Sequence, residues 1–278
     1  MFSDTHPDVE KIHVMISRSM PSWRRFRLVN DLIVTGRKLA LAGLRERFHG
    51  ASHRELHRRL ATLLLGPELA NKSMVPNPTL PPSDNAMEPL QILQRVISNL
   101  EVLGVHYMLV GSFASSLHGL ARFTQDADLI VDLHSSQLDA FAQAFASDFY
   151  VDLGLIQQAL TQGTSFNIIH FESSFKVDFF VVGGRTFSRE EFSRRILRQV
   201  DPRSEFGAYV QTPEDAVLSK LDWYRQGGEI SENQWRDVLG MLGQQAGRLD
   251  LVYLRKWAGE LGVADLLQRA CREADIEC

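Results

Sequence analysis

The chain has 278 residues, of which 44% are hydrophobic and 23% are charged, and its formal net charge at pH 7 is −4. These values are typical of globular proteins and argue against a disordered or fibrous chain. No apolar run approaches the length of a membrane span, so we expect no membrane partner.

The first residues lack the basic and apolar regions of a signal peptide. The two cysteines, Cys271 and Cys278, are too few and too late in the chain for a disulfide framework or a zinc site. We therefore expect a cytoplasmic protein. The sequence gives no indication of its oligomeric state.

The first segment, residues 1–70, has the pattern of a helical module. Apolar residues recur at helical spacing, and no proline occurs between Pro21 and Pro67. Ser52 and Glu55 form a capping box at the start of a second helix, which Gly66-Pro67 ends.

This N-terminal module is basic. Residues 1–75 contain 13 of the 30 Lys and Arg residues but only 7 of the 34 Asp and Glu residues. The module could bind RNA phosphates, dock on the acidic remainder of the chain as an inhibitor, or bind a partner. A solvated helical surface rich in arginine is an equally good interpretation.

Residues 71–87 contain four prolines and are expected to form a linker at which the modules separate. The core, 88–185, begins with a helix from Pro89 to Gly104. The pattern then predicts a strand at 106–110, a helix at 112–119, a strand at 127–133, a helix capped by Ser135 and Ser136 that runs to 146, a helix at 153–161, and a hairpin of 166–171 with 175–182.

The last region, 186–278, is expected to be helical, with Thr212 and Ser231 as helix N-caps. The order of elements predicts an α+β fold. It has a small mixed β-sheet core with helices, a helical N-terminal module and a helical C-terminal bundle.

The candidate catalytic and phosphate-binding residues lie mainly in two motifs of the core. Asp126 and Asp128 begin an apolar strand and point to the same side, because side chains alternate with period two. Two such charges are costly unless something neutralises them, and a hard divalent cation does so through oxygen ligands. Gly111-Ser112 follows the strand at 106–110, and Ser112 is expected to cap the next helix, which creates a phosphate site.

Together, Gly111-Ser112 and Asp126-x-Asp128 resemble the signature of the DNA polymerase beta-like nucleotidyltransferase superfamily. The resemblance covers about residues 88–245. The finer pattern resembles its bacterial toxin-type, abortive-infection-like branch and includes Ala114, His118, Gly119, Arg122 and Thr124. It implies an NTP substrate, Mg²⁺ or Mn²⁺, and an RNA acceptor such as a tRNA 3′ end, or a protein hydroxyl acceptor, in a toxin–antitoxin-type system.

By this resemblance Asp126 and Asp128 are metal ligands. Asp178 lies within an apolar strand, where an unpaired charge would be expensive, and is expected to be the third ligand and a candidate general base. The structural alternative for the pair is a solvated strand end or a helix cap.

Further residues are expected to bind the nucleotide. Arg122 and Thr124 share the side of Asp126, and Arg122 either binds phosphate oxygens or balances the carboxylates. The resemblance makes Lys220 a triphosphate contact, with an exposed lysine as the alternative. Arg236, with Asp237, positions the nucleotide or braces Lys220, and His118 is expected to be structural.

The sequence thus predicts a metal-dependent enzyme that transfers NMP from an NTP. The alternative is a non-catalytic nucleotide- or nucleic-acid-binding regulator that retains the fold. Neither the base of the NTP nor the acceptor follows from the residues.

Overall fold

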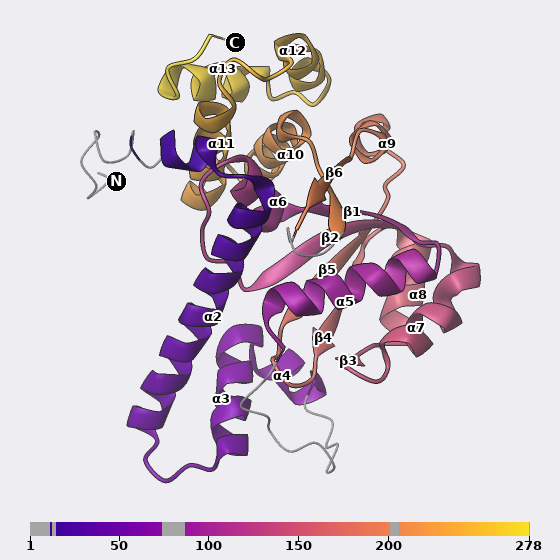
Figure 1. The fold of residues 1–278 in the computed structure, drawn as a ribbon. Coiled ribbons are helices and arrows are strands. Elements are labelled where there is room, and N and C mark those ends of the chain that lie inside the picture. The colour runs from indigo at the N-terminus through magenta and orange to yellow at the C-terminus, as the bar shows by residue number, and fades with distance from the viewer. Residues whose placement is uncertain (1–11, 13–14, 74–86, 201–205, 278) are drawn as a thin grey trace. The chain divides into compact units, whose positions relative to one another are not determined.

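The computed structural model describes residue 12 and residues 15–73, 87–200 and 206–277 (Figure 1). The chain divides into two compact units, each assembled from separate stretches of sequence. Unit 1 comprises Met1–Phe26, Leu109–Arg122 and Arg185–Cys278, and unit 2 comprises Arg27–Met108 and Phe123–Gly184.

The fold is α+β, as the sequence predicts. The strands among the described residues are β1 (His106–Val110), β2 (Asp126–Asp132), β3 (Phe149–Tyr150), β4 (Ser165–His170), β5 (Lys176–Val181), β6 (Ile196–Gln199) and β7 (Gly207–Val210). They follow the order β3-β4-β5-β2-β1-β7-β6 in a mixed sheet. The division between the units falls within β1, after Met108.

In unit 2, β2 pairs with β5 in parallel, and β4 pairs with β5 and β3 in antiparallel fashion. Side chains of β2 alternate strictly between half-buried and buried, and Ala127, Leu129 and Val131 are the buried set. One face of this part of the sheet is therefore core, and the other carries the acidic residues.

Helices cover the core face of unit 2. They include α5 (Pro89–Val102), α7 (Leu138–Phe145) and α8 (Leu153–Gln162). The ring of Phe141 on α7 lies against the rings of Phe166 and Phe179, with centroids 5.7 Å and 5.6 Å apart. Edge-to-face contacts of this kind add to the stabilisation from apolar burial.

Unit 2 also contains most of the expected N-terminal module. Helix α2 (Ser22–Arg47) enters this unit at Arg27, and α3 (His53–Leu65) and α4 (Pro67–Ser73) follow. Asn30 on α2 donates to Glu88 over 2.9 Å and accepts from the Leu90 N–H over 3.0 Å. Residues on both sides of the expected linker therefore pack in one unit.

The expected domain boundaries at 70, 87 and 185 stay predictions. Residues 71–73 of the expected linker form the end of α4. The rest of that linker, apart from Met87, lies outside the described residues.

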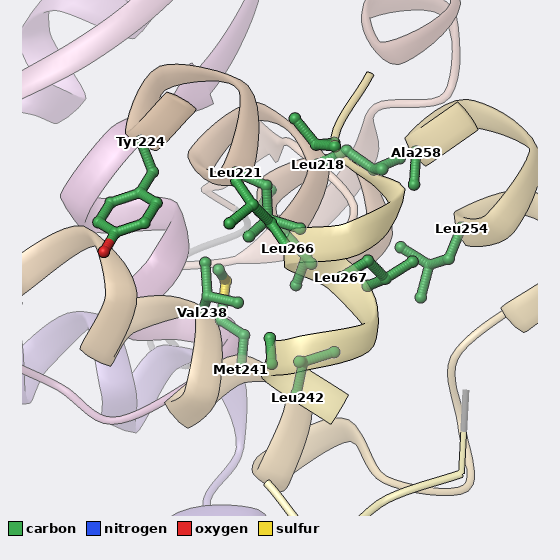
Figure 2. Packing of buried hydrophobic residues seen from close by; sticks show 14 of the residues in the cluster. Leu218, Leu221, Tyr224, Val238, Met241, Leu242, Leu254, Ala258, Leu266 and Leu267 are labelled. Atoms are coloured by element: carbon green, nitrogen blue, oxygen red, sulfur yellow. The ribbon is translucent and has the colours of Figure 1, made fainter. Parts of the chain in front are cut away.

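Unit 1 contains most of the expected helical C-terminal region. Its helices include α6 (Gly111–His118), α9 (Thr186–Ser193), α10 (Pro213–Gln226), α11 (Glu232–Gln245), α12 (Leu251–Glu260) and α13 (Ala264–Glu273). Figure 2 shows the apolar core formed by α10 to α13, which includes Leu218, Leu221, Val238, Met241, Leu242, Leu254, Leu266 and Leu267. Thr212 and Ser231 cap α10 and α11 as predicted, because each side chain accepts a first-turn N–H.

The structure corrects two local expectations. Ser135 and Ser136 do not cap a helix but begin the 3₁₀ turn η1 (Ser135–Gln137), whose N-cap is His134. Region 186–278 is not wholly helical, since it contains β6 and β7. Each of these strands has only four residues, most of them partly or fully exposed, so neither contains the longer apolar run that marks a buried strand.

None of the helices among the described residues combines the length and apolar character that crossing a membrane requires.

Candidate functional site

Three aspartates of unit 2 lie on one face of two paired strands. Asp128 on β2 is the register partner of Asp178 on β5, and Asp126 is the partner of Lys176. Partners in neighbouring strands share a face, so these four side chains form a block, which we call the carboxylate cluster. The third aspartate lies on a strand adjacent to the first two, as the sequence predicts.

Lys176 neutralises two of the three carboxylates. Its Nζ is 3.3 Å from Oδ2 of Asp126 and forms a shorter ion pair with Oδ2 of Asp178. Burial lowers the pKa of Lys176, but the hydrogen bonds and charges of the two aspartates outweigh burial and leave that pKa raised. Sequence reasoning did not assign Lys176 to the site, although it shares a strand face with Asp178.

Burial also acts on Asp178, which is 17% exposed. Desolvation raises the pKa of its carboxyl although the Lys176 ammonium acts in the opposite direction. Asn167 on β4 is the antiparallel register partner of Asp178. Thr124 instead contacts Asp126, since its Oγ1 lies 3.2 Å from both the backbone oxygen and Oδ1 of that residue.

The donor atoms of the cluster fit a hard divalent cation, because carboxylate oxygens are the ligands that Mg²⁺ and Mn²⁺ prefer. The carboxylates of Asp126 and Asp178 already meet at one cation, the Lys176 ammonium. Within the described part of the chain, however, no three His, Cys, Asp or Glu side chains are grouped so that they could hold a metal. The donor atoms thus suit a divalent cation, whereas their arrangement among the described residues does not form a metal site.

In unit 1, Gly111 and Ser112 begin α6. Gly111 has φ of 63°, in the left-handed region that favours glycine. The N-cap of α6 is Val110, so the expectation that Ser112 caps this helix is wrong. Its hydroxyl instead accepts a hydrogen bond of 2.7 Å from Nη2 of Arg122, because that guanidinium lies beside the first turn.

Arg122 and Lys220 meet at one buried carboxylate. Arg122 donates to Asp237 through Nε over 2.8 Å and through Nη2 over 2.9 Å, a two-point pairing. Nζ of Lys220 is 2.9 Å from Oδ2 of the same carboxylate. Because two cations share one anion, this group has a surplus positive charge. We call Ser112, Arg122, Lys220 and Asp237 the Asp237 cluster.

Arg236 is exposed on α11, whereas the side chain of its neighbour Asp237 is 6% exposed and pairs with Lys220. The sequence predicts that Arg236 and Asp237 either position the nucleotide or brace Lys220. In the structure Asp237 braces Lys220.

His118 is a buried structural residue. Its Nε2–H donates to the carbonyl oxygen of Gln211 over 2.6 Å, and burial lowers its pKa to about 4. Gln211 also donates from its side chain to Glu191 over 2.6 Å, and Ser219 donates to the same carboxyl over 2.9 Å. Burial raises the pKa of Glu191 to about 7.

The predicted site residues thus form two groups, each within one unit. Unit 2 brings together Thr124, Asp126, Asp128 and Asp178, and unit 1 brings together Ser112, Arg122 and Lys220 next to Gly111. The structure pairs Arg122 with Asp237, and the expectation that Arg122 binds phosphate oxygens or balances Asp126 and Asp128 stays a prediction.

Comparison with known proteins gives little further identification. No family model matches the chain, and no curated protein matches it. Among solved structures, it is similar to an antigenic nucleotidyltransferase-like protein from Paracoccidioides brasiliensis. The identity is 16% and the TM-score is 0.38, over 68% of this chain and 94% of that one. A likeness at this level is too distant to assign an activity.

Proposed function

We propose that the chain is a metal-dependent nucleotidyltransferase that transfers NMP from an NTP to a hydroxyl of RNA, such as a tRNA 3′ end, or of a protein. Its sequence motifs suggest a toxin–antitoxin-type component. The observation that carries the proposal is the convergence of Asp126 and Asp178 on one cation, with Asp128 in register beside them.

In this proposal the three aspartates hold Mg²⁺ or Mn²⁺, which when bound would stabilise negative charge at the reacting phosphate. The acceptor oxygen forms a bond to the α-phosphorus while the bond to the pyrophosphate oxygen breaks. Asp178 is the candidate base for the hydroxyl proton, because its carboxylate lies on the half-buried strand face and is only partly exposed to water. Thr124 orients Asp126 through their contact.

Triphosphate binding is assigned to the Asp237 cluster. Its surplus positive charge suits phosphate oxygens, because Arg122 and Lys220 both meet the single carboxylate of Asp237. Lys220 is 12% exposed and fixed by Asp237, so its ammonium is ordered in advance of ligand. Gly111 contributes the start of α6, where backbone N–H groups favour an anion, and exposed Arg236 is a further nucleotide contact.

A non-catalytic regulator that binds nucleotides or nucleic acid is the second candidate. The observation that favours it is the neutralisation of Asp126 and Asp178 by Lys176, which gives the carboxylates a partner without any metal.

A transfer assay tests the proposal. Each of the four labelled NTPs is incubated with the full chain, total RNA and total protein, with Mg²⁺, with Mn²⁺, and with chelator. We expect label on a macromolecule with one or more NTPs only when metal is present. Asp128→Asn should reduce the rate by about 100-fold or more, as loss of a transition-state charge contact does.

The matched control is Asp132→Asn, because Asp132 lies at the other end of β2 and is exposed. It should leave transfer unchanged. NTP binding without transfer under every condition would favour the regulator. Transfer that persists in chelator would contradict metal dependence.

A further inference from the structure

Lys176 occupies a special position within unit 2. It is the cation that two aspartates from different strands share, and it lies on the same strand face as both. Its side chain is 23% exposed, so water does little to separate the charges. Without this ammonium, Asp126 and Asp178 would repel each other at a partly buried position.

We propose that Lys176 is an internal competitor of the divalent cation. Its ammonium holds Asp126 and Asp178 together before metal arrives, and metal binding displaces it from both carboxylates. This inference rests on the proposed function, because it concerns the metal of that reaction, but its tests do not require activity.

The charges of the cluster support this exchange. The three aspartates and Lys176 together carry a net charge of −2, and a divalent cation neutralises the remainder. Oδ2 of both Asp126 and Asp178 contacts the ammonium, so a metal held by these two carboxylates would compete with Lys176 for the same side chains. Lysine suits an exchangeable role because its charge is compact and its stem is flexible.

Manganese binding to the full chain tests the competition. We expect Lys176→Gln to bind Mn²⁺ about tenfold more tightly than the unmodified chain, because a positive charge a few ångströms away no longer opposes the metal. Lys176→Arg keeps the charge and should stay within about threefold of the unmodified affinity. Unchanged or weaker binding by Lys176→Gln would overturn the proposal.

Arg95→Gln is the matched control. Arg95 is also in unit 2, but its Nη2 contacts a single carboxylate, Asp148, over 2.6 Å. Removing that cation should leave the Mn²⁺ affinity unchanged. An equal increase in this variant would show a general effect of net charge and would overturn the specific role of Lys176.

A measurement on the unmodified chain covers the case in which Lys176→Gln does not fold. Nζ of Lys176 is labelled with an amine-reactive reagent, with and without Mn²⁺, and the peptide is quantified by mass spectrometry. We expect labelling of Lys176 to rise at least about threefold with Mn²⁺, since displacement exposes the amine. No rise at saturating Mn²⁺ would overturn the proposal.

The experiments separate this inference from the proposed function. If the unmodified chain binds Mn²⁺ through Asp128 but neither Lys176 readout responds, only the inference fails. If the Lys176→Gln protein binds Mn²⁺ but the unmodified chain does not, the metal cannot displace Lys176. That result contradicts both the proposed displacement and a metal-dependent reaction. Absence of binding to any variant contradicts both proposals as well.

Discussion

Charged side chains in both units share oppositely charged partners. Asp237 pairs with Arg122 and Lys220, and Lys176 pairs with Asp126 on the neighbouring strand and with Asp178 two residues away. Removal of one member of such a group leaves a partly buried charge uncompensated, which costs more than the pair contributes. Each of these residues is therefore constrained by folding as well as by any chemistry that it performs.

Glu191 gives a prediction about pH. Its carboxyl is 6% exposed, and burial raises its pKa to about 7 from 4.5. The folded state therefore holds this proton more tightly than the unfolded state does. The resulting stabilisation is complete below about pH 4.5 and is lost as pH rises through 7, by up to about 3 kcal/mol.

Urea unfolding at about pH 5 and pH 8 measures this loss. Glu191→Gln should show a smaller decrease between the two pH values than the unmodified chain. Glu190→Gln, one residue earlier on α9, should keep the full decrease. The comparison between variants is needed because buried His118, whose pKa is lowered to about 4, contributes a trend of opposite sign. Equal decreases in all three proteins would refute the assignment.

At the scale of elements, the close approach of α6 to α11 depends on Gly119. A Cβ at this position would lie 3.1 Å from the backbone nitrogen of Met241 and 3.2 Å from the carbonyl carbon of Gly240. These are backbone atoms, which cannot swing aside as a side chain does. We expect Gly119→Ala to lower the free energy of unfolding by about 1–2 kcal/mol.

Gly43 is the control for that substitution. It lies within helix α2, and apart from its chain neighbours and the backbone of its own helix no described residue has an atom within 4 Å of the position that its Cβ would take. Gly43→Ala should raise the free energy of unfolding by about 1 kcal/mol, because alanine is the better helix former. Chemical denaturation of both variants measures the two effects, and a Gly119→Ala protein as stable as the unmodified chain would disprove the close-packing argument.

At the scale of the whole molecule, the contacts within unit 2 predict whether the two pieces of a cleaved chain stay associated. Limited proteolysis is expected to cut within 71–87, where the prolines cluster. We expect the two pieces to remain associated, because Asn30 bonds to Glu88 and Leu90 and the Arg37 guanidinium donates to the Ser173 carbonyl. Non-denaturing size exclusion measures this, and separate elution of a folded C-terminal piece would instead support independent modules.

Local signals predicted many of the elements. Thr212 and Ser231 cap helices as their spacing indicates, and the pair 165–170 and 176–181 forms the expected hairpin. These features depend on neighbours within a few residues, so sequence alone contains them. The sequence does not predict strands β6 and β7, because a strand of four residues is too short to show a clear alternation of apolar and polar residues.

By itself, the sequence determined the α+β class, the shared face of Asp126 and Asp128, and the strand that holds Asp178. These follow from period-two alternation and from the cost of burying a lone charge. Only the tertiary structure decided that Lys176 binds carboxylates on two strands, and that Ser112 accepts from Arg122 rather than capping α6. The physical reason is that strand register and long-range ion pairs depend on residues distant in the chain, whose meeting no local pattern encodes.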